Sequence, residues 1–234
     1  MADPQTAFPP PEALRDKALE VHRRLLAHFG KPVWRQPLPP LDELVSTILS
    51  QNTNDTNRDR AFFALKARYP SWEAVRDAPA EEVIATIRPA GLANQKGPRI
   101  QHVLRQITAE QGRLTLDYLA ETPPDEAKRH LTRFKGVGPK TAAIVLQFSL
   151  GKPAFPVDTH IYRVTGRLGL RPPNISREAA HDFLEKVFPP ETYYDAHLNL
   201  IRLGREICTA RKPRCEVCPL RDLCDFACTQ EAAA

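Results

Sequence analysis

Apolar side chains recur at helical spacing along most of the chain. Near the N-terminus an apolar stripe fills every third or fourth position until Gly30, which predicts a helix over residues 12–29. Further helical patterns lie at about 41–49, 56–68, 80–88, 97–110, 126–134, 139–150, 159–168, 176–187 and 191–207. Alternating strand-like patterns are almost absent. We therefore expect an all-α fold with short loops between antiparallel neighbours.

The composition points to a protein of the cell interior. No apolar run among the 234 residues approaches the length of a membrane span, and the first residues lack the apolar core of a signal peptide. Four of the five cysteines lie in one short cluster, which is not the pattern of a secreted disulfide scaffold. We expect a cytoplasmic protein, associated with the nucleoid if it is bacterial, and no membrane partner.

Positive charge is concentrated in one stretch, residues 131–171. It holds seven Lys or Arg residues against a single acid, Asp158, so it carries +6 of a whole-chain net charge of +5. Lysines spread over a surface for solubility do not concentrate in this way, whereas a face that binds a polyphosphate does. The stretch therefore predicts a surface that binds nucleic acid.

Inside this stretch, Gly136-Val137-Gly138 lies between two segments with helical patterning. Pro139 suits the first position of the second helix, because its missing N–H is not needed there. Glycines on both sides of Val137 permit a hairpin tight enough to aim N–H groups outward at a helix N-terminus, where the dipole favours an anion. The hairpin is either a phosphate site or only a turn between packed helices.

Two residues near the hairpin can carry chemistry. Lys140 lies in the first turn of the second helix, where the helix dipole disfavours a cation. A lysine held there beside other cations loses its proton more readily and becomes a usable nucleophile. Asp158, eighteen residues later, follows an apolar segment and begins another helix. It suits a helix N-cap, and that role is compatible with acid–base chemistry.

The sequence FKGVGPKTA followed by VDTHIYRV resembles the helix-hairpin-helix DNA glycosylases, specifically their endonuclease III branch. That branch has a GVG hairpin, a lysine two residues after it, and an aspartate in VDTH eighteen residues beyond the lysine. The resemblance implies base-excision repair, in which Lys140 attacks C1′ of a damaged nucleotide and Asp158 assists. It implies two helical lobes flanking a DNA-binding groove. We expect DNA contacts by Lys135, Gly136, Val137, Gly138 and His160; the family often has proline where Lys135 stands, so this lysine adds charge to the hairpin.

Two loops in the first half hold further candidates. The sequence SQNTND at 50–55 is an ordinary turn composition. The family has LSAQATD at this place, with a glutamine that enters the DNA where the damaged base has left, and Asn52 takes that position here. In GLANQKG at 91–97, Leu92 is either a packing residue or, as the family implies, an apolar wedge that fills the gap left by a flipped nucleotide.

Cys208, Cys215, Cys218 and Cys224 are spaced C-x6-C-x2-C-x5-C. Four thiolates this close can hold one metal centre, and by chemistry alone both zinc and a [4Fe-4S] cluster are open. The resemblance implies the [4Fe-4S] cluster, because the spacing is similar to the cluster loop of the endonuclease III branch. Cys228 has no counterpart in that pattern, and we interpret it as a spare thiol.

Three cations, Arg211, Lys212 and Arg214, lie between the first two cysteines of this pattern. On a loop whose ends are fixed by a metal centre they predict a second surface that contacts phosphate. The alternative is a solvated run of charge.

The resemblance implies three segments. Residues 1–39 form a tail and a helix that packs with the C-terminal lobe, residues 40–151 a six-helix lobe ending in the hairpin, and residues 152–234 a helical lobe with the cluster loop. We expect a monomeric, bifunctional DNA glycosylase and abasic-site lyase that excises oxidised pyrimidines from double-stranded DNA. A monofunctional glycosylase for alkylated or mismatched bases, suggested by the departure at residues 51–54, and a non-catalytic DNA-binding module remain alternatives.

Overall fold

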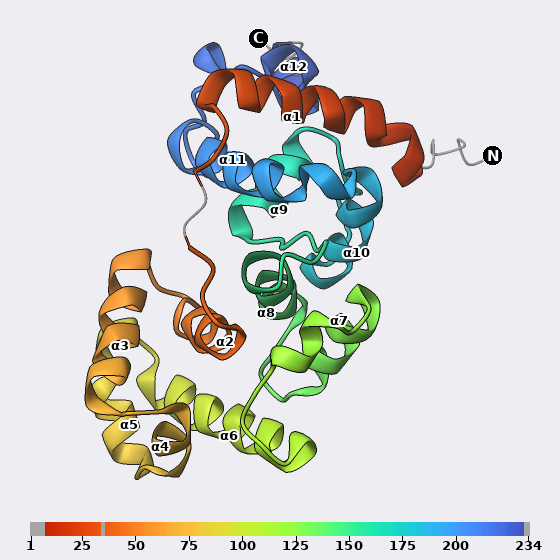
Figure 1. Cartoon of the computed structure of the whole chain (residues 1–234). Helices are drawn as coiled ribbons and strands as arrows, with labels where there is room; N and C mark the ends of the chain where they lie inside the picture. The colour runs from red at the N-terminus through yellow and green to blue at the C-terminus, as the bar shows by residue number, and fades with distance from the viewer. Residues whose placement is uncertain (1–7, 34–35, 232–234) are drawn as a thin grey trace, which may run out of the picture. The chain divides into compact units, whose positions relative to one another are not determined.

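The computed structural model describes residues 8–33 and 36–231, and these residues form helices with no strand among them (Figure 1). The all-α prediction is confirmed. The chain divides into two compact units, one of Met1–Arg35 with Pro153–Ala234 and the other of Gln36–Lys152. The first is called unit 1 below and the second unit 2. The tail expected at residues 1–7, and residues 34–35 of the expected connector, lie outside the described residues.

Unit 2 is a bundle of helices of different lengths (Figure 1). They are α2 (Pro40–Leu49), α3 (Asp55–Arg68), α4 (Trp72–Asp77), α5 (Ala80–Thr86), α6 (Ala93–Gln111), α7 (Pro124–Arg133) and α8 (Pro139–Ile144). The 3-10 helices η2 (Arg88–Ala90) and η3 (Asp117–Ala120) connect them, and a π-helical turn, η4 (Val145–Ser149), continues α8. The single helix expected over residues 139–150 is therefore an α-helix that widens into a π turn, a form that is frequent at functional sites.

Two helices form the centre of unit 2. Every side chain of α2 from Glu43 to Leu49 is buried, and α2 contacts α3, α6 and α8. The longest helix, α6, packs against α4 and α5 and buries Ile100, Leu104 and Ile107. Because α2 and α6 are held on several sides, the loops that follow or precede them start from fixed positions.

Unit 1 joins the N-terminal helix to the C-terminal part of the chain (Figure 1). Its elements are η1 (Pro11–Leu14), α1 (Arg15–Phe29), α9 (Thr159–Arg167), α10 (Arg177–Val187), η5 (Pro190–Thr192), α11 (Tyr193–Glu206), η6 (Cys215–Val217), η7 (Arg221–Leu223) and α12 (Asp225–Glu231). The predicted stripe of α1 is buried at Ala18, Val21 and Leu25, and α1 packs on α11. The core of unit 1 also includes Phe155, which stacks on Phe188 with ring centroids 5.0 Å apart.

Side-chain caps fix where several helices begin. Asn54 caps α3 and accepts a hydrogen bond from the Asn57 N–H at 2.8 Å. Ser176 caps α10 in the same way, as its sequence position predicts. Among the described residues, no helix is both long and apolar enough to cross a membrane.

Candidate functional site

The hairpin between α7 and α8 has the tight geometry that its sequence predicts. Gly136 has a φ of +101°, and a Cβ there would lie 2.6 Å from Cδ of Arg99, so a glycine is required on both counts. Gly138 is extended and caps α8, whose first residue is Pro139, as expected. Within the described residues, the N–H groups of Gly136 and Gly138 have no hydrogen-bond partner. These donors are available to an anion beside the exposed Lys135.

Val137 does not fit the DNA contact expected of it. Its side chain is only 4% exposed, and its N–H donates to the carbonyl of Phe134 at 2.9 Å. The apolar side chain packs into unit 2 because burial removes it from water. Val137 therefore anchors the hairpin, and the contacts to a ligand are left to its neighbours.

The two predicted catalytic residues belong to different units. Lys140 is the second residue of α8 in unit 2 and is half-buried. Asp158 is the N-cap of α9 in unit 1, where its Oδ1 accepts a hydrogen bond from the Ile161 N–H at 2.7 Å. The predicted cap role of Asp158 is confirmed. The cap uses Oδ1, so the Oδ2 atom can accept a further proton or hydrogen bond. The catalytic roles of both residues stay predictions.

His160 lies in the first turn of α9, and its Nδ1 is 3.1 Å from Nη2 of Arg163. The guanidinium can only donate, so Nδ1 accepts and the ring proton lies on Nε2. Arg163 also donates to the carbonyls of Gly204, at 2.8 Å, and Cys208, at 3.1 Å. It thereby joins the start of α9 to the first cysteine of the cluster pattern. The sequence reasoning missed Arg163, although its i+3 spacing from His160 placed both on one helix face.

Asn52 and Leu92 share a conformation that is unusual for their residue types. They are the two non-glycine residues with positive φ among the described residues, at 51° and 49°. Leu92 is 47% exposed and begins α6 as its N-cap, so it is not buried in a core. A leucine in the left-handed region costs about 1–2 kcal/mol, and such strain gathers at functional sites. The simple packing interpretation of Leu92 does not account for these features.

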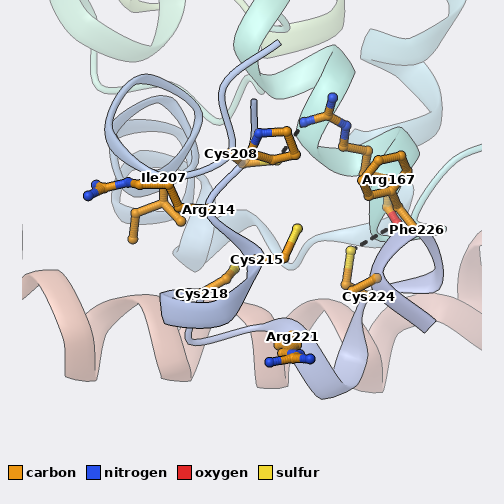
Figure 2. A pocket seen from close by; sticks show the side chains of 11 residues that line it. Arg167, Ile207, Cys208, Arg214, Cys215, Cys218, Arg221, Cys224 and Phe226 are labelled. Atoms are coloured by element: carbon orange, nitrogen blue, oxygen red, sulfur yellow. Dashed lines mark hydrogen bonds between the residues drawn. The ribbon is translucent and has the colours of Figure 1, made fainter. Parts of the chain in front are cut away.

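The four predicted ligand cysteines line one cavity, together with Arg167 and Phe226 (Figure 2). Arg167 donates from Nη1 to Sγ of Cys208 at 3.2 Å and to the carbonyl of Thr209 at 2.8 Å. Its guanidinium carbon lies 4.7 Å from the ring centroid of Phe226. The thiol of Cys224 donates to the Arg167 carbonyl at 3.3 Å. One arginine of α9 therefore fixes both ends of the cysteine cluster.

The donor set of this cavity suits an iron–sulfur cluster. Burial raises the pKa of the Cys218 thiol to about 11, and burial also raises the pKa of Cys224, so binding of a metal centre must displace their protons. No three His, Cys, Asp or Glu side chains in the described part of the chain are placed to hold a single metal ion. Four cysteine thiols that line one cavity are a ligand set that a [4Fe-4S] cluster uses. Cys228 is exposed and does not line the cavity.

The three cations of the cluster loop are not equivalent. All three are exposed, but they differ in their contacts. Arg214 donates from Nη2 to the carbonyl of Glu206 at 2.6 Å, which turns it back toward the end of α11. Two cations of α1 contact the C-terminal side of the loop and the start of α12: Lys17 lies 2.7 Å from Asp225, and Arg24 lies 2.5 Å from Asp222. The loop therefore offers Arg211 and Lys212 to a ligand and uses Arg214 to hold its own shape.

Two family models match the chain. Residues 45–190 match the HhH-GPD superfamily of base excision DNA repair proteins, and residues 208–224 match the iron–sulfur binding domain of endonuclease III. The chain belongs to the endonuclease III family. This member of the family is 33% identical to endonuclease III of Thermotoga maritima over 88% of its own length and 92% of the relative. A putative DNA glycosylase of Arabidopsis thaliana is 39% identical, over 77% of this chain, which spans only 64% of that relative's length.

Solved structures agree with this family. A non-covalent endonuclease III–DNA complex has a TM-score of 0.76 and 27% identity and covers 96% of this chain and 99% of the solved one. A trapped covalent endonuclease III–DNA intermediate has the same TM-score and 28% identity, covering 93% and 98%. The resemblance predicted from the motifs is confirmed. The match over residues 208–224, which starts and ends at a cysteine of the cluster pattern, also confirms the [4Fe-4S] cofactor over zinc.

Proposed function

We propose that this endonuclease III family member is a bifunctional DNA glycosylase and abasic-site lyase that excises oxidised pyrimidines from double-stranded DNA as a monomer. The observation that carries the proposal is the hairpin, whose unpartnered donors at Gly136 and Gly138 lie directly before Lys140. A phosphate held by those donors brings its neighbouring sugar to the first turn of α8. The trapped covalent intermediate of a relative supports attack by a protein nucleophile.

DNA is held by two groups of residues, one in each unit. In unit 2 the hairpin donors and Lys135 bind backbone phosphate. In unit 1 the exposed Arg211 and Lys212 each bind a further phosphate, and His160 offers its Nε2 proton. Neither group reads a base sequence, because all of these contacts are to the backbone.

Extrusion of the damaged nucleotide opens a gap in the stack, and unstacking costs a few kcal/mol. Leu92 and Asn52 occupy that gap, the leucine as an apolar wedge and the asparagine through hydrogen bonds to a base edge. Their exposed, left-handed backbone positions support this role. Asn52 reaches one methylene less than the glutamine of the family pattern, so the opposite base is contacted differently.

Lys140 supplies the nucleophile. Its place in the first turn of α8 favours the neutral amine, which attacks C1′ while the bond from C1′ to the base breaks and the base leaves with the electron pair. After the amine loses a proton, the nitrogen lone pair forms the C1′=N bond of a Schiff base while the C1′–O4′ bond breaks, and O4′ takes up a proton as the sugar ring opens. The Schiff base permits removal of a C2′ proton and release of the 3′ phosphate by β-elimination. Asp158 accepts the lysine proton and stabilises positive charge on the sugar.

Cys208, Cys215, Cys218 and Cys224 hold the [4Fe-4S] cluster. The cluster supplies a rigid cross-link for the loop that carries Arg211 and Lys212, and Arg167 maintains the same loop by its own contacts. No redox step is needed for base excision by this route.

A panel of duplexes tests the substrate class. Purified protein with its cluster bound should cleave strands carrying oxidised pyrimidines or abasic sites and leave an undamaged duplex intact. Release of alkylated or mismatched bases without strand cleavage would favour the monofunctional alternative, which the departure at residues 51–54 suggests. Binding without any reaction would favour a non-catalytic module.

A further inference from the structure

Two cations of α6 have side chains that turn into unit 2. Lys96 is 1% exposed, and its Nζ donates to the carbonyl of Leu49 at 2.8 Å and to that of Ala90 at 2.7 Å. Arg99, one helical turn later, donates from Nη1 to Oε1 of Gln51 at 2.8 Å. Lysine is almost never fully buried unless its charge is matched, so this ammonium needs an explanation.

Both carbonyls that Lys96 binds stand at the end of a helix. Leu49 is the last residue of α2, and Ala90 is the last residue of η2. Carbonyls at helix C-termini lack partners within the helix and carry the negative end of the dipole. One ammonium therefore caps two helices at once. The chain reaches Asn52 three residues after the first cap and Leu92 two residues after the second.

The same face of α6 also supports the hairpin. The methylenes of Arg99 lie against Gly136, and Oε1 of Gln106 accepts from the Lys135 N–H at 3.1 Å. All three loops of unit 2 that carry predicted DNA contacts therefore rest on side chains of one helix. Two of these loops carry the predicted gap-filling residues, Asn52 and Leu92. The Lys96 ammonium binds the carbonyls that precede both of them.

We propose that Lys96, assisted by Arg99, is a positioning residue that holds Asn52 and Leu92 as one rigid pair, so that both enter the gap of a flipped nucleotide together. This inference rests on the proposed function, since it concerns the gap-filling step. A side chain on a mobile loop loses conformational entropy when it enters the DNA. Hydrogen bonds that already fix the loop in the free protein remove this entropy cost from the binding step.

An ammonium is not needed merely to fill space at this point. Burial and the nearby charge of Arg99 lower the pKa of Lys96, so keeping a lysine at this buried position costs free energy that an apolar side chain would not. A methionine of similar length would pack without that cost, but it could not bind two carbonyls. Lys96→Met is therefore the informative variant.

Gln101 provides a matched control on the same helix. It is also 1% exposed, and its Nε2 donates to the carbonyls of Val75 at 2.9 Å and Ala78 at 2.8 Å, where α4 ends. Gln101→Met thus removes a buried double carbonyl contact that leads to no predicted DNA contact. Any effect of Lys96→Met that Gln101→Met also produces belongs to general loss of packing.

Hydrogen exchange of the free protein gives a readout that needs no substrate. In Lys96→Met, the hydrogen-bonded amides within residues 50–54 and 91–94, those of Ser50, Gln51 and Gly91, should exchange about tenfold faster or more, because their local opening no longer requires breaking the contacts of Lys96. In Gln101→Met, the increase should be confined to residues 75–79. Unchanged exchange at residues 50–54 and 91–94 in Lys96→Met, or the same increase in the control, would overturn the proposal.

Abasic-site cleavage separates the wedge from the chemistry. Lys96→Met should cleave an abasic site in duplex DNA about tenfold or more slowly, while cleavage of the same site in a single strand, which needs no gap filled, stays within about twofold. The double variant Lys96→Met/Leu92→Ala should be no slower on duplex than the slower single variant. Equal losses on both substrates, or additive losses in the double variant, would contradict a positioning role.

Two further outcomes are decisive. If Lys96→Met does not fold, the half-buried Arg99→Met takes its place and should speed exchange at residues 50–54 but not at 91–94; no change at 50–54 would count against the proposal. A wild-type protein that cleaves no lesion or abasic duplex would refute the proposed function, and the exchange measurement would still decide the role of Lys96.

Discussion

Replacing Arg211 with alanine should reduce the salt dependence of DNA binding, whereas replacing Arg214 should leave it unchanged. The sequence alone treats the two as equivalent, since both lie between Cys208 and Cys215. Both side chains are exposed, but the Arg214 guanidinium is already bound to the Glu206 carbonyl at 2.6 Å, whereas Arg211 makes no hydrogen bond or ion pair within the described part of the chain. Only a cation placed at a phosphate displaces a counterion from DNA, and a guanidinium held on the protein backbone is kept from that position.

The magnitude follows from counting the exposed cations of the two DNA-binding groups. Lys135, Arg211 and Lys212 are exposed, so they predict a slope of log K against log salt of roughly −2.7, at about −0.9 for each neutralised phosphate. Loss of Arg211 should change the slope to about −1.8. At about 0.1 M salt the same loss weakens binding roughly eightfold.

The assay is fluorescence anisotropy with an undamaged duplex over a series of salt concentrations. Wild type, Arg211→Ala and Arg214→Ala are compared as full chains with equal cluster content, checked by visible absorbance. An equal change of slope for both variants, or none for Arg211→Ala, would refute the distinction between the two arginines.

Three further predictions follow from single positions. Gly136→Ala should destabilise the protein by about 1–3 kcal/mol in a thermal melt, because Gly136 has a positive φ and lies against Arg99. Gly138→Ala places nothing within 4 Å of the new Cβ, so its stability should lie within about 0.5 kcal/mol of wild type. Equal melting temperatures of the two variants would contradict this. Leu92→Gly should leave the stability unchanged or raise it by about 1 kcal/mol, because it relieves the strain of a left-handed leucine. The same variant should cleave duplex DNA about tenfold more slowly. A Leu92→Gly protein that is less stable and fully active would count against the wedge role. Iron analysis should find about four irons per chain, falling to background in Cys215→Ala, and stoichiometric zinc in their place would exclude the cluster.

Local motifs in the sequence were enough to predict the hairpin, the helix caps at Asp158 and Ser176, and the family. Gly136, Pro139 and Asp158 act through backbone conformation and near neighbours, so their roles depend on residues within a few positions. The stripe of α1 was equally readable, because helical periodicity shows which face is buried even when its partner is distant. These features need no knowledge of tertiary packing.

The contacts that the sequence could not predict join residues far apart in the chain. Lys96 binds Leu49, 47 positions away, and Arg167 binds Cys208, 41 positions away. Val137 was predicted to contact DNA because it stands inside the hairpin motif, but the fold of unit 2 buries it. A residue within a motif can face a ligand or pack into the protein, and only the tertiary structure distinguishes the two.

The central claim is that Lys140 forms the covalent bond to DNA, and borohydride trapping tests it most directly. Borohydride added during turnover of an abasic duplex should reduce the Schiff base and leave a covalent protein–DNA adduct that migrates slowly on a denaturing gel, since an imine requires a primary amine. Lys140→Gln should give no adduct and no strand cleavage, while its binding to an uncleavable abasic analogue stays within about tenfold of wild type. An adduct of undiminished yield in Lys140→Gln would contradict the claim and assign the nucleophile to another amine.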